Sequence, residues 1–212
     1  MRFQMTLIDS ITLVMNPGDE TKLIRAAAAG DAAAFSNLYR LHRDRVYGFA
    51  YRMLGAQSVA EDVTHEAFLV LIEHPERYRP ERGSLLTFLC AVTRNHIMHH
   101  FRRRGYELSE TDCGAADLTE RANETERDPL GNLLEQELAA RVNNAIAALP
   151  PLQREAIVLR EFQELSYEEI AVVTGAGVNV VRGRLHRARQ SLAEQLAPYM
   201  NEDSKRYELR RG

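Results

Sequence analysis

The chain has few cysteines and no long apolar run, and these absences exclude several classes of protein. Only Cys90 and Cys113 occur among 212 residues, which excludes a disulfide framework and fits a reducing compartment. No apolar run approaches the roughly 18 residues that a membrane span requires, so we expect no membrane insertion. Residues 1–18 form a mildly apolar extension without a small-residue cleavage site, and Met15 is an alternative start within it. A soluble cytoplasmic protein is therefore expected, with no role assigned to either cysteine.

Negative charge is concentrated in one part of the sequence. The chain has 27 Lys and Arg against 30 Asp and Glu, which gives a net charge of -3. Residues 105–130 hold eight of the acids and only two of the bases, so the rest of the chain is basic. Because this segment is polar and has no sustained apolar period, it is predicted to be a flexible linker between two domains.

Helical periodicity dominates before the linker, and a weak alternating pattern occurs only in the N-terminal extension. Asp31, Ser58 and Ser84 stand where N-caps are preferred, and Glu61 would complete a capping box with Ser58. Glycines close the first two helices. The helices expected in the first domain cover residues 20–29, 31–55, 58–72 and 84–104.

Four more helices, all short, are expected after the linker. Pro150 and Pro151 stop one helix and start the next, and Ser166 with Glu169 has the spacing of another capping box. The predicted fold class is all-α, with two small four-helix domains joined by the acidic linker. The predicted boundaries are 1–18 for the extension, 19–104 for the first domain, 105–130 for the linker, 131–198 for the second domain and 199–212 for a polar tail.

The stretch 165–190 has the spacing of a helix-turn-helix. Ala171 is small where two helices would cross, Gly175 follows where the turn needs a positive φ, and Val181 would seat the second helix. Leu185 continues the apolar stripe of that second helix, whose other faces are polar and cationic. Such a helix is suited to a DNA major groove, where arginine binds guanine or phosphate. An ordinary surface helix with solvated arginines is the alternative, but the agreement of turn, cap and stripe favours DNA binding.

Two blocks of the sequence resemble the extracytoplasmic-function (ECF) sigma factors of bacteria. The second block, "ALPPLQREAIVLREFQELSYEEIAVVTG" with "VRGRLHRAR", is similar to the DNA-reading domain of that family. In the first block, "AEDVTHEAFLVL" resembles the polymerase-docking helix and "GSLLTFLCAVTRNHIMHHFRRR" the promoter-melting helix. The resemblance covers about residues 19–198. It implies a sigma factor that binds core RNA polymerase, recognises the minus-thirty-five and minus-ten promoter elements and promotes DNA opening, with no enzymatic activity and no cofactor.

The resemblance also implies site residues and partners. Positions that would dock on the clamp helices of the polymerase largest subunit are Glu61, Asp62, Glu66, Phe68 and Leu69. Positions that would contact the minus-ten element during melting are Tyr78, Arg79, Arg82, Arg94, Asn95, His99, Arg102 and Arg103. Positions that would read the minus-thirty-five element are Asn179, Val180, Arg182, Gly183, Arg184, His186 and Arg187. Other helices of the second domain would meet the flap of the second-largest subunit, and whether an anti-sigma factor binds is left open.

Some positions have a second interpretation or depart from the family pattern. Tyr78 is either a stacking platform for a flipped base or ordinary packing, and Glu61 could serve only as a cap. The chain has no Trp, and Ile72 and Phe88 occupy the places where many relatives carry one. Gly183 lies inside the expected reading helix and costs about 1 kcal/mol relative to Ala, although a small residue lets the backbone approach DNA.

Three other classes of function compete with this interpretation. A response regulator with a similar DNA-reading domain would carry receiver strands, but residues 19–104 lack the short β-branched runs of such strands. A metal-dependent enzyme could use His96, His99 and His100, whose spacing places two imidazoles on one helical face. However, no carboxylate motif accompanies these histidines. The third alternative is an adaptor for polymerase that does not read DNA.

Overall fold

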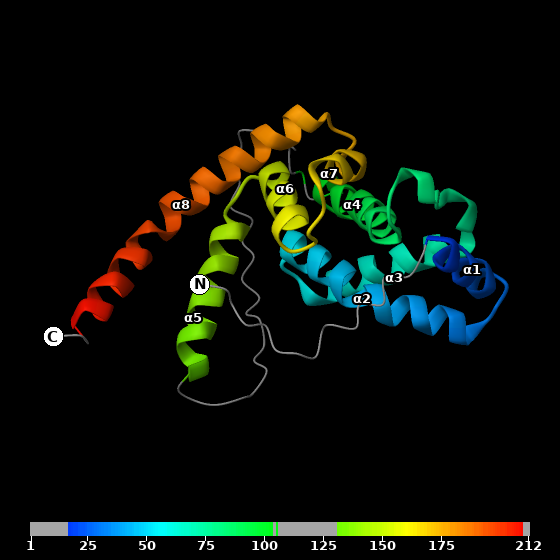
Figure 1. Cartoon of the computed structure of the whole chain (residues 1–212), viewed down its shortest axis with the longest axis horizontal. Coiled ribbons are helices and arrows are strands. Elements are labelled where there is room, and N and C mark those ends of the chain that lie inside the picture. Colours follow the sequence, from blue (N-terminus) through cyan, green and yellow to red (C-terminus); the bar gives the residue numbers. More distant parts are fainter. Residues whose placement is uncertain (1–16, 104, 106–130, 210–212) are drawn as a thin grey trace.

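The computed structural model describes residues 17–103, 105 and 131–209, and the regular elements among them are helices (Figure 1). Those of the first half are α1 Pro17–Ala28, α2 Ala32–Leu54, α3 Gln57–Glu73, the 3₁₀ turns η1 Pro75–Arg77 and η2 Pro80–Arg82, and α4 Leu85–Arg103. Those of the second half are α5 Gly131–Ala147, α6 Pro151–Glu161, α7 Tyr167–Thr174 and α8 Val178–Leu209. The all-α prediction of two helical domains is confirmed. The predicted linker lies outside the described residues except for Gly105, so the exact domain boundaries stay a prediction.

Local capping signals set most of the helix ends in the first domain. The Asp31 carboxylate accepts from the backbone N–H of Ala33 at 2.9 Å, and Gly55 ends α2 at φ 71°. The Ser84 hydroxyl accepts from the N–H of Thr87 at 3.2 Å, as expected of a cap for α4. The predicted capping box at Ser58 is wrong, because α3 already begins at Gln57 and has no side-chain cap.

Two helices of the second domain begin at the expected residues, and the last helix is longer than expected. Pro151 is the first residue of α6, and Ser166 forms a complete capping box with Glu169 at the start of α7. Gly175 takes φ 66° in the turn that follows. The expectation of short helices is wrong for α8, which is 32 residues long and runs through Pro198 and the predicted polar tail.

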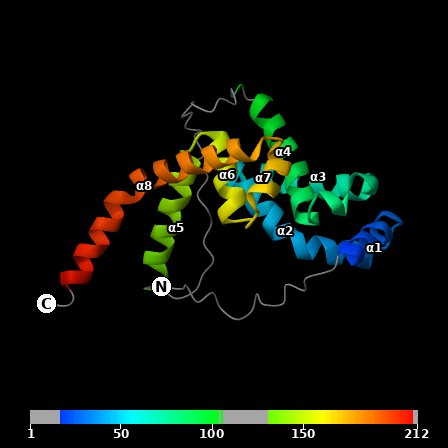
Figure 2. The same cartoon turned by 45° about the horizontal axis from the view of Figure 1, so that its top comes forward.

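The two domains pack directly against each other. Helix α6 lies between α8 on one side and α2 on the other, and α7 lies against α4 (Figures 1 and 2). Residues 151–159 of α6 are consequently buried all round. Beyond this contact, α5 and the distal part of α8 extend away from the first domain (Figure 2).

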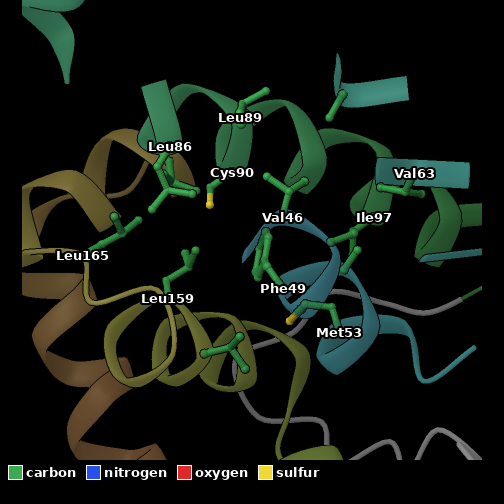
Figure 3. Close-up of a cluster of buried hydrophobic side chains, with 14 of the residues drawn as sticks. Val46, Phe49, Met53, Val63, Leu86, Leu89, Cys90, Ile97, Leu159 and Leu165 are labelled. Atoms are coloured by element: carbon green, nitrogen blue, oxygen red, sulfur yellow. The ribbon is translucent and has the colours of Figure 1, made fainter. Parts of the chain in front are cut away.

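An apolar layer fills the space between the two domains, as Figure 3 shows. Side chains from α2 and α4 form one side of this layer, and side chains from α6 and the turn before α7 form the other. Those labelled from the first domain and facing the layer are Val46, Phe49, Met53, Leu86 and Cys90, and those from the second are Leu159 and Leu165. One continuous core therefore joins the halves of the chain.

Candidate nucleic-acid interface

The first half of α8 has the geometry of a DNA-reading helix. The apolar stripe of Val181, Leu185 and Ala188 is fully buried against the rest of the second domain. Helix α7 and the left-handed Gly175 precede it, which completes a helix-turn-helix. The residues of the first two turns that point outward are therefore fixed by a well-packed support. Among the predicted contacts, those that are exposed are Asn179, Val180, Arg182, His186 and Arg187.

Arg184 does not belong to this exposed face, although it was predicted to contact DNA. Only 9% of it is exposed, and its positive charge lies close enough to Glu155 of α6 to oppose the rise in pKa that burial causes in that carboxyl. Because 184 follows the buried stripe residue 181 by three, its side chain turns toward the interior. In this arrangement Arg184 supports the helix and is not available to a base.

The predicted docking positions form an edge along α3. Asp62, Glu66 and Leu69 are exposed and Glu61 is half-buried, so carboxylates lie beside an apolar side chain that is 48% exposed. Phe68 is only 1% exposed and packs against the ring of Tyr39, with 4.8 Å between ring centroids. Phe68 therefore holds α3 in place and does not itself present a docking surface.

The cationic residues of α4 are divided between an open face and a covered one. Asn95, His99, Arg102 and Arg103 are exposed, and this open face extends to the C-terminal end of the helix, where phosphate contacts were predicted. Arg94 is different because the second domain covers it. Its Nε donates to the Oε1 of Glu155 at 2.6 Å.

The loop before α4 presents arginines but not the tyrosine. Arg79 and Arg82 are exposed, whereas Tyr78 is only 7% exposed. Its hydroxyl donates to the Glu20 carboxylate at 3.0 Å, and its ring meets that of Phe88 edge-on at 5.8 Å. Burial is the main cause that raises the pKa of Tyr78, followed by the negative charge of Glu20. Of the two interpretations of Tyr78, ordinary packing is therefore the one that fits its position here.

Sequence reasoning missed a polar network on α6. Arg154 is fully buried, and its guanidinium donates to the backbone carbonyl of Met53 in α2 at 3.1 Å. It also donates to the carbonyls of Leu149, at 3.1 Å, and Ala147. Its neighbour Glu155 is buried as well, and burial raises the pKa of Glu155 while Arg94 opposes that shift. In the sequence, the only indication that α6 is covered on both sides is the apolar run 156–159, which directly follows the charged residues 154 and 155.

An apolar hollow of about 270 Å³ lies between α5, α6 and α8. Val142, Ile146, Ile157, Phe162 and Leu192 line it. At its rim the Arg189 guanidinium donates to the Glu161 carboxylate at 2.8 Å. This hollow is on the second domain, away from the exposed face of α8's first turns that was predicted to read DNA.

The rival metal site receives no support. Among the described residues, no three His, Cys, Asp or Glu side chains come together in a way that could hold an ion. His99 is exposed, while His96 and His100 are half-buried. The part of the chain that the structure describes also contains no helix long and apolar enough to cross a membrane.

The helix-turn-helix, joined to a second helical domain with an exposed anionic edge on α3, is typical of a DNA-binding transcription factor. The family model for sigma-70 region 2 matches residues 38–106, and the model for sigma-70 region 4 matches residues 139–192. The chain belongs to the ECF RNA polymerase sigma factors. It is accordingly a promoter-specific initiation factor that binds core RNA polymerase and promoter DNA.

Curated relatives agree with this assignment, and solved structures share the fold. The chain is 35% identical to the ECF sigma factor SigE of Mycolicibacterium smegmatis over 89% of this chain and 73% of that protein. It is 30% identical to the sigma-H factor of Pseudomonas aeruginosa over 86% of this chain and 96% of that one. Among solved structures, Bartonella quintana RpoE in complex with the anti-sigma factor NepR has a TM-score of 0.61 at 23% identity, covering 77% of this chain and 96% of RpoE. CnrH in complex with the cytosolic domain of CnrY has the same TM-score at 24% identity, covering 84% and 97%. These structural likenesses support the fold.

Proposed function

We propose a division of labour among three surfaces of this sigma factor. The edge of α3 docks on the clamp helices of the polymerase largest subunit, α4 with its preceding loop opens the minus-ten element, and the first turns of α8 read the minus-thirty-five element. The observation that carries this proposal is the separation of an exposed anionic edge, Asp62 and Glu66, from the exposed cationic face of α8 around Arg182. Carboxylates suit a protein partner with a basic surface, whereas arginine suits phosphate and guanine.

Further partners follow from the same assignment. The apolar hollow between α5, α6 and α8 is the surface that we assign to the polymerase flap, because a concave apolar surface suits an apolar segment of a partner. An anti-sigma factor is a further proposed partner, supported by the solved relatives in which such a factor is bound. The protein acts in the cytoplasm by binding alone and catalyses no reaction itself.

Charge reversal on α3 tests the docking edge. The double variant Asp62→Lys and Glu66→Lys places two cations where the proposal needs anions, while both positions are exposed and tolerate the change. We expect association with core polymerase to weaken by roughly tenfold or more, equivalent to about 1.4 kcal/mol. Glu73→Lys, at the exposed end of the same helix, is the matched control and is expected to bind normally. Binding of the double variant as tight as that of the control would remove the docking assignment.

A further inference from the structure

Helix α1 is not one of the three surfaces proposed above, but it lies beside the loop that precedes α4. The family model for sigma-70 region 2 begins at residue 38, after this helix has ended. In the structure α1 packs against α2 and α3, and it also touches η1, the first turn of the loop. A helix outside the matched region therefore borders the loop that was assigned to the minus-ten element.

One carboxylate of α1 holds both ends of this loop. Glu20 accepts a hydrogen bond at 3.0 Å from the hydroxyl of Tyr78, the residue at which η1 ends. Burial raises the pKa of Glu20, and the Tyr78 hydroxyl and the backbone N–H of Leu85, which hydrogen-bond to the carboxylate, oppose that rise. Because Leu85 is the first residue of α4, the negative charge also lies at the positive end of that helix dipole. Residues 79–84 are thus tied at both ends to the same side chain.

The segment between these two anchors is fixed by its own turn. In η2 the N–H of Arg82 donates to the carbonyl of Arg79 at 2.9 Å. Gly83 follows at φ 146°, which side chains rarely adopt, and a Cβ there would lie 3.2 Å from the Thr87 methyl carbon. Both arginines remain exposed. The loop is therefore stiff between its ends, and its position depends on the anchors.

A fixed loop discriminates between bases better than a loose one. Capture of single-stranded DNA uses cations that contact the backbone and groups that contact the base, and each must already be in position. A loop that is ordered before DNA arrives also loses less conformational entropy on binding. A mobile loop, in contrast, can repack around several different bases, as flexible binding surfaces do. Anchoring therefore affects which base is preferred as well as how tightly it is bound.

We propose that Glu20 is a positioning residue for recognition of the minus-ten element. Through Tyr78 and the start of α4, it holds residues 79–84 in the geometry that distinguishes one base of the element from another. Glu20 and Tyr78 act through the exposed Arg79 and Arg82 and do not contact DNA themselves. The inference rests on the function proposed above for this loop.

Base preference of the holoenzyme tests this role. A promoter library randomised in both elements gives, at each position, the ratio of activity between the best base and the others. Glu20→Ala and Tyr78→Phe should each lower this ratio by roughly three- to tenfold within the minus-ten element, since each removes the hydrogen bond between the two side chains. Ratios within the minus-thirty-five element should not change. Glu20→Gln keeps an oxygen that accepts from Tyr78 and should retain most of the preference.

Asp19→Ala is the matched control. Asp19 is the neighbouring acid on α1, is exposed, and pairs with Lys22 on the surface at 3.4 Å. Its removal should leave the preference in both elements as in the wild type. A loss of minus-ten preference in this variant equal to that of Glu20→Ala would overturn the proposal, because the effect would then follow from any loss of charge on α1.

The double variant separates positioning from a contact that merely stabilises the fold. Because Glu20 and Tyr78 act through one hydrogen bond, Glu20→Ala combined with Tyr78→Phe should be no worse than Glu20→Ala alone. Effects that multiply would overturn the proposal, and so would an equal loss of activity on every promoter with unchanged base preference. If circular dichroism shows that Glu20→Ala does not fold, Tyr78→Phe decides, because its ring keeps the buried packing. Unchanged minus-ten preference in Tyr78→Phe overturns the role of Glu20.

The variant Arg79→Ala with Arg82→Ala distinguishes this failure from failure of the proposed function. It removes the exposed cations of the loop, so unchanged minus-ten preference in this variant would contradict the function proposed for the loop. Loss of preference in the arginine variant but not in Tyr78→Phe would leave that function in place and overturn only the positioning role. Loss of preference in both variants is the result that we expect.

Discussion

The two basic helices of this sigma factor differ in what covers them. In α8 the first three turns present Arg182 and Arg187 on an exposed face, above a stripe that is buried within the same domain. In α4 the corresponding cation, Arg94, faces the other domain and is paired with Glu155. The difference shows that a DNA-binding arginine is available only if no other part of the fold competes for it.

The largest effect is expected from Arg154, whose buried guanidinium joins the two domains. Arg154→Ala leaves the carbonyls of Met53, Leu149 and Ala147 without this donor, and it creates a cavity in a fully buried site. We expect a loss of about 3–5 kcal/mol in the free energy of unfolding. Urea unfolding followed by circular dichroism measures it.

Arg160→Ala is the matched control for this change. Arg160 lies on the same helix, is half-buried, and donates to the Leu165 carbonyl at 2.9 Å. Its loss should cost only about 1 kcal/mol. Equal costs for the two variants would mean that Arg154 does not link the domains energetically.

Two substitutions with smaller expected effects, one in each basic helix, distinguish the roles of α8 and α4 in DNA binding. Arg182→Ala should remove a base contact, which costs about 1–3 kcal/mol and relaxes selectivity within the minus-thirty-five element. Arg102→Ala, at the exposed end of α4, should weaken binding on all promoters and reduce the log–log salt slope by roughly one unit. Promoter-library profiles of both variants in holoenzyme at two salt concentrations distinguish these outcomes. Uniform loss for Arg182→Ala with altered base preference for Arg102→Ala would reverse the assignment.

The smallest effect is expected at Gly183, on the exposed half of α8. A Cβ built there comes no closer than 3.6 Å to a side-chain atom of Arg187, so alanine fits the free protein. Gly183→Ala should raise the free energy of unfolding by up to about 1 kcal/mol through helix propensity. If the backbone approaches DNA at this point, affinity for a minus-thirty-five duplex should fall in the same variant. Unchanged affinity would show that Gly183 makes no close approach.

Local signals in the sequence predicted the features that depend on near neighbours. The Asp31 cap, the Ser166 and Glu169 capping box and the left-handed Gly175 each involve residues at most four apart, and all three are confirmed. The expected cap at Ser58 was wrong because Gln57 already adopts the helical conformation and needs no side-chain cap. No glycine or proline interrupts α8 between 184 and 197, and the helix then continues through Pro198 to Leu209, beyond the length expected for it.

Contacts across the fold could not be predicted in this way. Arg94 and Glu155 are 61 residues apart, and Tyr78 and Glu20 are 58 apart, so no spacing rule relates them. Each partner alone has an ordinary interpretation, as a DNA contact, a surface acid or a stacking ring. Only the packing of α6 onto the first domain shows that Arg94 is covered in the free protein.

Chemical modification of arginine, followed by mass spectrometry, tests the contrast between the two helices most directly. Phenylglyoxal reacts with exposed guanidinium groups, so its rate at each arginine reports exposure in the intact protein. In the free protein we predict rapid modification of Arg182 and at least tenfold slower modification of Arg94, in proportion to their burial. Equal rates at the two arginines in the free protein would contradict the account.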